Sequence, residues 1–520
     1  MKRLSYTVSA IIVMTALTPL KAVELSELLI QSAGGEAALE TLRNLQAWEV
    51  HGRAMLNGQQ ATFVQYFVRP NRQYTELTFP EFSVVQAFDG EVAWQTDLNG
   101  RVSELEGYAR KEIVENVYLE SFEYLFSDSL ARIATYIGLE EQGGEVRHKV
   151  AFYPLGSDTL YAFFDTLTGL REVVISNADQ LQSYTYLDDY RDVSGLMVPH
   201  HTWNEVPEAL AKMEFWVDTF LINSPVDSSI FSKPEQTVID FSFPAGVAEV
   251  TLPIKYEDGH IRIPVTINGK KKVWMLLDTG SSSNVFNSGA IADLGLPEVG
   301  TMSALGLGGA EQVKLVRTDS VQIGELVLYN QIGGSMDLSK AFSSSGGEVF
   351  GGVLGQDFWS RFTILVDYAR SKITVYSPGS VNPPSGGISV PFYRTMLIPT
   401  VGCSVDGVAG DFIVDIGNPS GVLLNKYFVE QNQLEDKLSL SLYARRAFGG
   451  VGGMVTGRNA YTSIFRIGDI ELRSLLVFLP DTAVGMMASR EIAGNIGNRV
   501  LEKFRVLFDY ENSRLVFYRY

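Results

Sequence analysis

The chain has 520 residues, of which 46% are hydrophobic and 20% charged, and this composition suits several packed globular domains. Its 60 Asp and Glu residues outnumber its 42 Lys and Arg residues, which gives a formal net charge of −18. This balance excludes nucleic acid and anionic membrane surfaces as partners, because both require a basic surface. The single cysteine, Cys403, excludes an intrachain disulfide, and we expect it to be buried as a small apolar residue.

The first 22 residues have the pattern of a secretory signal. Lys2 and Arg3 precede an apolar stretch from Val8 to Leu17, and Ala22 is a suitable cleavage position. An uncleaved membrane anchor is the alternative, but the apolar stretch is short for crossing a bilayer. We therefore predict a signal peptide over 1–22 and an exported, soluble mature chain. An exported chain without disulfides fits a bacterial periplasm.

Residues 23–235 are predicted to form one β-rich unit. A helix is expected over 24–46, interrupted by Gly34 and Gly35, and the apolar spacing predicts a second helix over 113–139. Alternating apolar and polar runs around them predict strands. The segment 224–236 is rich in Ser and Pro and predicts a linker.

Several short motifs follow one another in this unit: GGEAAL from Gly34, FDGEVAW (88–94), FDTLTGL (164–170) and DYRDVSGLMVPHH (189–201). In this order they resemble the LolA/LolB-like family of periplasmic lipoprotein carriers. The resemblance implies a half-barrel of strands with a few helices, and contact with a lipid or lipoprotein. An unrelated β-rich domain is the alternative, because turn chemistry alone can place these residue pairs at strand ends.

The remainder of the chain contains an internal repeat. Residues 354–376 align without a gap to residues 496–518, so that Gly355 pairs with Gly497 and Asp367 with Asp509. Upstream, 263–280 and 398–417 each read as a strand, a turn and an apolar strand that ends in Asp-x-Gly. The repeat predicts two copies of one β-rich lobe, over 249–378 and 388–520, joined by a Pro/Gly/Ser linker.

The first Asp-x-Gly lies in LLDTGSSSNVF (276–286), which resembles the active-site loop of the retropepsin and pepsin family of aspartic peptidases. The resemblance implies that Asp278 and Asp415 form a catalytic pair that shares one proton, one residue from each lobe. It also implies that the pair is supported by neighbours in the two loops, namely Thr279, Gly280, Ser281, Gly417 and Asn418. A plain β-turn is the alternative for a single Asp-Thr-Gly.

The second loop departs from the family pattern. Ile416 stands where the family has Thr, and Asn418 stands where it has Ser or Ala. In the family, paired threonines exchange hydrogen bonds between the loops, and Ile416 cannot donate one, so we expect only Thr279 to contribute. We also expect the Ser281 hydroxyl to donate to Asp278 and the Asn418 amide to donate to Asp415.

Two glycine-rich segments are expected to be the flaps of the family. The flap residues in the first lobe are Leu305, Gly306, Leu307, Gly308 and Gly309, and those in the second are Gly449, Gly450, Gly452 and Gly453. A phosphate-binding loop is the rival interpretation, but no Lys-Ser or Lys-Thr follows. The segments 353–357 and 495–499 resemble the part of the family fold that passes beneath each active-site loop.

Other reaction types find little support. The five histidines include no HExxH pair and join no cysteine cluster, and no GxSxG elbow is present, so we predict no metal, no cofactor and no serine hydrolase. The predicted fold is mainly β, with an N-terminal half-barrel followed by two retropepsin-like lobes. The predicted function is an aspartic endopeptidase that acts on peptides or proteins as a monomer. The alternatives are a peptide-binding protein with an inactive peptidase fold and a lipid- or lipoprotein-binding protein.

Overall fold

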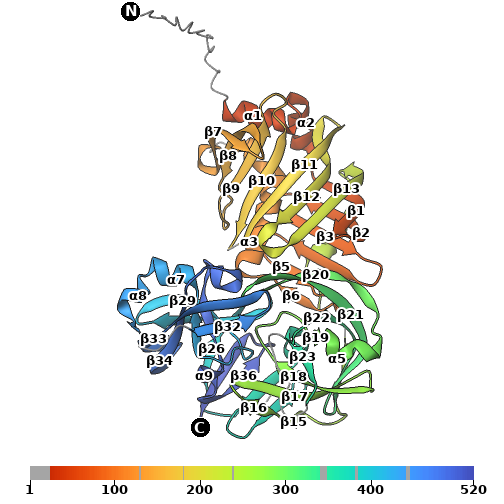
Figure 1. Cartoon of the computed structure of the whole chain (residues 1–520). Helices are drawn as coiled ribbons and strands as arrows, with labels where there is room; N and C mark the ends of the chain where they lie inside the picture. Colours follow the sequence, from red (N-terminus) through yellow and green to blue (C-terminus); the bar gives the residue numbers. More distant parts are fainter. Residues whose placement is uncertain are drawn as a thin grey trace, which may run out of the picture.

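The computed structural model describes residues 24–127, 130–179, 181–236, 239–339, 348–380, 384–440 and 446–520. The predicted signal peptide lies outside the described residues. Within these ranges the chain is mainly β and is built from several large sheets, which confirms the predicted fold class at this level (Figure 1). Within the same ranges, we find no helix with the length and apolar character needed to cross a membrane.

The N-terminal region forms one long antiparallel sheet, which is drawn above the C-terminal sheets in Figure 1. Its strands follow the order β6-β5-β4-β3-β2-β1-β13-β12-β11-β10-β9-β8-β7. Asn57 and Gly58, both at positive φ, make the tight turn between β1 and β2. The strands are β1 (Ala47–Leu56), β2 (Gln59–Val68), β3 (Arg72–Thr78), β4 (Ser83–Phe88), β5 (Ala93–Thr96), β6 (Val102–Glu104), β7 (Ala134–Gln142), β8 (Glu145–Phe152), β9 (Leu160–Asp165), β10 (Arg171–Ala178), β11 (Leu181–Val193), β12 (Leu196–Val206) and β13 (Ala211–Ile222).

Helices pack against this sheet and bury its apolar face. The expected break at Gly34 and Gly35 is present, since both have positive φ and separate α1 from α2. Apolar side chains of α2 and α3 join a core with β1 and β2 that includes Leu42, Val50 and Ile113. The helical elements of the region are α1 (Leu25–Ala33), α2 (Glu36–Asn44), α3 (Gly107–Ser121), η1 (Glu123–Phe126), α4 (Leu130–Ile133), η2 (Pro207–Ala209) and η3 (Ser228–Phe231).

The predicted helix over 113–139 is interrupted at Phe122 and is wrong from residue 134 onward. The helix α3 ends at Ser121, where Phe122 adopts a left-handed conformation, and residues 134–142 form β7 instead. Ile137 and Leu139, which fall inside the predicted helix, are 51% and 46% exposed on an edge strand. Pairing with β8 therefore determined the structure here, rather than helical periodicity.

The segments named here lobe 1 (residues 249–378) and lobe 2 (residues 388–520) each build a sheet of the same design. In each, the strand before the Asp-x-Gly lies parallel to a later strand: β18 beside β23, and β29 beside β35. The first sheet contains β14 (Phe241–Ser242), β16 (Lys255–Glu257), β17 (His260–Ile267), β18 (Lys271–Leu277), β19 (Val285–Asn287), β20 (Glu298–Gly306), β21 (Gly309–Ile323), β22 (Leu326–Met336) and β23 (Phe350–Leu354). The second contains β27 (Tyr393–Thr395), β28 (Ile398–Val405), β29 (Val408–Val414), β30 (Val422–Leu424), β31 (Ser439–Leu440), β32 (Arg446–Gly450), β33 (Gly453–Ile467), β34 (Ile470–Pro480) and β35 (Ile492–Ile496).

A further sheet takes strands from both lobes and joins them. Its central strands β24 and β36 are antiparallel, and Leu365 lies opposite Leu507, its own equivalent in the sequence repeat. An equivalent residue can face its copy in this way only near a pseudo-two-fold axis, so the axis passes through this sheet. The strands are β15 (Glu249–Pro253), β24 (Thr363–Asp367), β25 (Lys372–Tyr376), β26 (Ile388–Pro391), β36 (Phe504–Asp509) and β37 (Arg514–Arg519).

One apolar core runs through both lobes and includes Met275, Phe412 and Phe508. Cys403 belongs to this core and is buried, as expected. Short helical elements complete the lobes: α5 (Ser288–Ile291), η4 (Ala292–Leu294), α6 (Gln356–Trp359), α7 (Lys426–Gln431), α8 (Leu434–Lys437), η5 (Gly485–Ala488) and α9 (Asn498–Leu501).

Candidate active site

The two Asp-x-Gly loops begin in the same way. Asp278 follows β18 directly, and its N–H donates to the Leu354 carbonyl of β23 at 3.0 Å. Asp415 follows β29, and its N–H donates to the Ile496 carbonyl of β35 at 2.9 Å. Each buried pair of parallel strands therefore fixes the position of one half-buried carboxyl group.

The loops meet across the axis, and each carboxyl group lies over the glycine of the other loop. A Cβ atom added to Gly417 would lie 2.4 Å from Cγ of Asp278, and one added to Gly280 would lie 2.5 Å from Cγ of Asp415. These distances are too short for non-bonded atoms, so only glycine fits at either position. The structure therefore brings Asp278 and Asp415, which are far apart in sequence, to one place.

The environment of Asp278 favours its protonated form. Burial raises the pKa of Asp278 well above its ordinary value, and the charge of Asp415 and a side-chain hydrogen bond with it raise this pKa further. The N–H groups of Gly280 and Ser281 act in the opposite direction. Two interacting carboxyl groups of this kind titrate as a pair.

Thr279 connects the two loops. Its hydroxyl donates to the Val414 carbonyl at 2.6 Å and accepts the N–H of Ile416 at 3.1 Å. Ile416 is fully buried and packs into the core of the lobes. Half of the threonine exchange is therefore present, and an aliphatic contact occupies the place of the other half.

A second pair of connections lies beneath the loops and also crosses the axis. The Gln356 amide donates to the Thr279 carbonyl and to the Tyr510 hydroxyl, at 2.8 and 2.9 Å. Asn498, the repeat equivalent of Gln356, donates to the Ile416 carbonyl and accepts from the Tyr368 hydroxyl, at 2.6 and 2.7 Å. Each loop is thus held through a tyrosine of the opposite lobe.

The loop side chains at 281 and 418 behave differently from the expectation. The Ser281 hydroxyl donates to the Ser283 carbonyl at 2.8 Å, and only its main-chain N–H acts on Asp278. The Asn418 side-chain amide donates to Oδ1 of Asn495 at 2.9 Å, while its main-chain N–H donates to Asp415 at 3.1 Å. The hydroxyl and the side-chain amide each donate to another acceptor instead.

Asn495 is a site residue that the sequence reasoning missed. Its amide donates to Oδ2 of Asp415 at 2.6 Å. It lies on β35, and its equivalent in the first repeat is the aliphatic Val353 on β23. That difference between otherwise matched repeats was the available signal.

The glycine-rich segments form hairpin tips that touch each other. Leu305 and Gly306 end β20, Leu307 and Gly308 form the turn, and Gly309 begins β21. In lobe 2, Gly449 and Gly450 end β32, and Gly453 begins β33 after a turn that contains Gly452. The N–H of Gly308 donates to the Val451 carbonyl at 3.0 Å, so the two tips are in direct contact.

The N-terminal region forms hydrogen bonds with the β20–β21 hairpin of lobe 1. The Gln59 amide donates to the Val299 carbonyl at 3.0 Å and accepts the Thr301 N–H at 3.2 Å, as a neighbouring strand would. Asn57 donates to the Ser303 hydroxyl at 3.0 Å. Since β20 is an edge strand, the turn between β1 and β2 covers part of its free edge.

The N-terminal region also contacts Asp357, which supports the loop that carries Asp278. The buried carboxyl of Asp357 accepts the N–H of Asn284, at the end of that loop, at 2.6 Å and the side-chain amide of Asn99 at 2.9 Å. Burial and the charge of Asp97 raise the pKa of Asp357 to about 6, although Arg361 opposes them. A polar contact between regions therefore supports the position of the loop.

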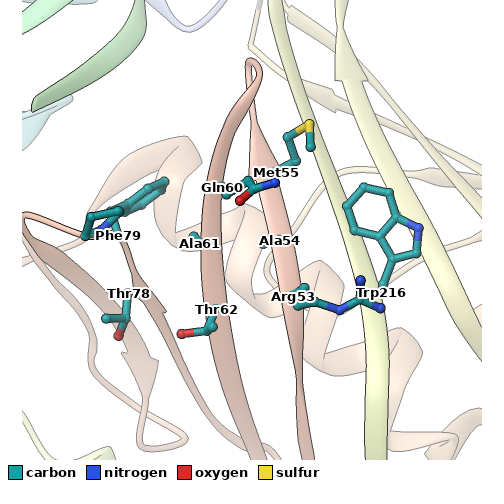
Figure 2. Close-up of a pocket in the computed structure, with 10 residues that line it drawn as sticks. Arg53, Ala54, Met55, Gln60, Ala61, Thr62, Thr78, Phe79 and Trp216 are labelled. Carbon is teal, nitrogen blue, oxygen red and sulfur yellow. The ribbon is translucent and has the colours of Figure 1, made fainter.

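The hollow in Figure 2 lies in the N-terminal sheet, and neither Asp278 nor Asp415 is among the residues that line it. Its volume is about 680 Å³, and Trp216 of β13 and Met55 of β1 lie along it with Phe79 on the other side. Within the described ranges we find no gathering of three His, Cys, Asp or Glu side chains that would hold a metal ion. Asp278 and Asp415, which the two loops bring together, are the candidate active site.

One family and two solved structures are similar to parts of this chain. Residues 263–358 match a family described as aspartyl protease, a range that contains Asp278 and the segment beneath its loop. One similar solved structure is an aspartic proteinase from Irpex lacteus, with 13% identity over 52% of this chain and 97% of that one and a TM-score of 0.36. Another is a DUF1329 family protein from Desulfovibrio piger, with 10% identity over 40% of this chain and 95% of that one and a TM-score of 0.28. A search of curated proteins found no match.

The family match supports a peptidase-like fold of the aspartic type for the region around Asp278.

Proposed function

We propose that the protein is an aspartic endopeptidase in which Asp278 and Asp415 activate one water molecule. The observation that carries the proposal is the reciprocal placement of each carboxyl group over the glycine of the opposite loop. The raised pKa of Asp278 supports it, because the reaction requires one protonated and one ionised carboxyl group at the same pH.

The reaction follows from that unequal pair. The ionised carboxylate removes a proton from water as the water oxygen attacks the scissile carbonyl carbon, and the protonated carboxyl gives its proton to the carbonyl oxygen. The resulting diol then returns a proton to that carboxyl, the C–N bond breaks, and the other carboxyl protonates the leaving nitrogen. The products are a carboxylic acid and an amine, and the pair regains its single proton.

The hairpin tips of Leu305–Gly309 and 449–453 are proposed to be flaps that cover a bound peptide. Since both lobes belong to one chain, we propose a catalytic monomer that acts on peptides or proteins. The signal-like N-terminus supports export to a periplasm. The domain limits of 23–235, 249–378 and 388–520 and the LolA/LolB-like resemblance stay predictions.

The test is a peptide-library cleavage assay across pH, with Asp278→Asn and Asp415→Asn compared with the unaltered chain. Each substitution should remove nearly all cleavage, and the double variant should be no worse than either single one, because the two groups act as a unit. Asp469→Asn, on an exposed turn of lobe 2, is the matched control and should keep full activity. Substantial cleavage by Asp415→Asn would refute the proposed pair.

Ile416 favours a second candidate, a peptide-binding protein without turnover. The buried isoleucine interrupts the connection that the peptidase family makes between its loops. This candidate predicts that library peptides bind with measurable affinity and are recovered intact at every pH, and cleavage that depends on Asp278 would exclude it.

A further inference from the structure

A directional chain of hydrogen bonds ends on Asp415. The N–H and hydroxyl of Ser420 donate to Oδ1 of Asn418, at 2.9 and 2.6 Å. Nδ2 of Asn418 then donates to Oδ1 of Asn495 at 2.9 Å, and Nδ2 of Asn495 donates to Oδ2 of Asp415 at 2.6 Å.

The direction of this chain is fixed at its start. A main-chain N–H can only donate, so the Ser420 N–H requires the oxygen of the Asn418 amide to face it. The nitrogen of Asn418 must then face Asn495, which presents its own oxygen to Asn418 and its nitrogen to Asp415. The group that reaches Oδ2 of Asp415 is therefore a donor, and that oxygen must accept.

Asp415 receives donors on both oxygens. Its Oδ1 accepts the N–H groups of Gly417 and Asn418, at 2.7 and 3.1 Å, and its Oδ2 accepts from Asn495. Three N–H donors on one carboxylate favour its ionised form. In lobe 1 the equivalent of Asn495 is Val353, which has no donor, and the hydroxyl of Ser281 is directed to a main-chain carbonyl.

We propose that Asn495 is a positioning residue that keeps Asp415 ionised, so that Asp415 is the base and Asp278 carries the proton. The assignment rests on the proposed peptidase function for its catalytic meaning. It identifies which lobe accepts the proton of water and which lobe donates to the substrate carbonyl. The buried, raised-pKa state of Asp278 agrees with it.

Two titratable groups lie close to Asp415. Asp278 faces it across the loops, and Tyr510 is connected to the site through Gln356. Burial raises the pKa of Tyr510 above its ordinary value, so Tyr510 stays neutral over the range in which carboxyl groups titrate. The acid titration of the site therefore reports the carboxyl pair.

The decisive variant is Asn495→Val, which gives lobe 2 the residue of lobe 1. The carboxyl titration is followed in the full chain by NMR of ¹³Cγ-labelled aspartate, with Asp278→Asn and Asp415→Asn used to assign the two signals. Loss of a charge-assisted donor should raise the pH of the first ionisation step by about one to two units. The acid limb of kcat/KM should move upward by the same amount. Asn425→Val, which alters another buried amide of lobe 2 that donates to the Ile492 carbonyl, should leave both unchanged.

Each outcome decides between specific statements. If the first ionisation step does not move in Asn495→Val, or if Asp278 ionises first in the unaltered chain, the positioning role is refuted. If that step moves upward but no peptide is cleaved by any form, the positioning role stands and the peptidase function fails. If Asn495→Val does not fold, Asn418→Ser, which removes the amide that orients Asn495, should shift the step in the same direction by a smaller amount, and no shift would refute the role.

Discussion

Replacing Gly417 by alanine should displace the carboxyl group of Asp278 and remove most of the activity. The new methyl carbon would lie 2.4 Å from Cγ of Asp278, whereas ordinary carbon contacts are about 3.5 Å, so a shift of about 1 Å is needed. A misplacement of that size lowers a rate by about 100-fold, which is about 2.7 kcal/mol of transition-state stabilisation. We therefore expect kcat/KM to fall by at least that factor, with a loss of stability of about 1–3 kcal/mol from overpacking.

The assay compares kcat/KM on one cleaved peptide with the unfolding midpoint of the same samples. Gly289→Ala is the matched control, since a Cβ atom there meets nothing within 4 Å. The control should keep its activity, and Gly280→Ala should resemble Gly417→Ala because its methyl group would press on Asp415. A folded Gly417→Ala protein with activity within about threefold of the original would refute the close approach of the two loops.

Three other changes test separate parts of the structure. Ile416→Thr should change the unfolding free energy by at most about 1.5 kcal/mol, because a new hydrogen bond between the loops offsets the lost aliphatic contact; a clear loss of both stability and turnover would show that the isoleucine is adapted to its place. Gln59→Ala should increase hydrogen exchange at 299–306, measured by mass spectrometry, and unchanged exchange would mean that the amide does not restrain the hairpin. Burial raises the pKa of Glu115 from its ordinary value of 4.5 to about 7. The protonated carboxyl therefore contributes its full stabilisation to the folded state below pH 4.5, and this contribution is lost as the pH rises to 7. Glu115→Gln should therefore lose less stability than the unaltered chain between those pH values in thermal melts, and parallel curves would contradict the assignment.

The repeat marked both candidate loops, because Asp278 and Asp415 each end an apolar strand in matching segments. The structure adds that these strands lie parallel to β23 and β35. The contribution of Thr279 was implied by the family resemblance, and its hydroxyl donates to the Val414 carbonyl of the opposite loop.

Other features depend on contacts that sequence does not encode locally. Asn495 differs from Val353 inside an otherwise matching segment, and its importance appears only when its amide is seen beside Asp415. The Ser281 hydroxyl donates to the carbonyl of Ser283, and the sequence does not show which of several nearby acceptors a hydroxyl will use. Gln59 is the first residue of β2, and nothing in the sequence around it indicates that its amide contacts the edge strand β20.

The two hairpin tips that contact each other differ at two matched positions, where Leu305 and Leu307 correspond to Gly449 and Val451. Leu307 and Gly308 form the turn on one side, and Val451 and Gly452 form it on the other, with a hydrogen bond from Gly308 to Val451. In a site built from two identical chains, an extended peptide has the same energy when its direction is reversed. In the proposed peptidase, the two ends of a bound peptide would meet different side chains, so its two directions would differ in energy.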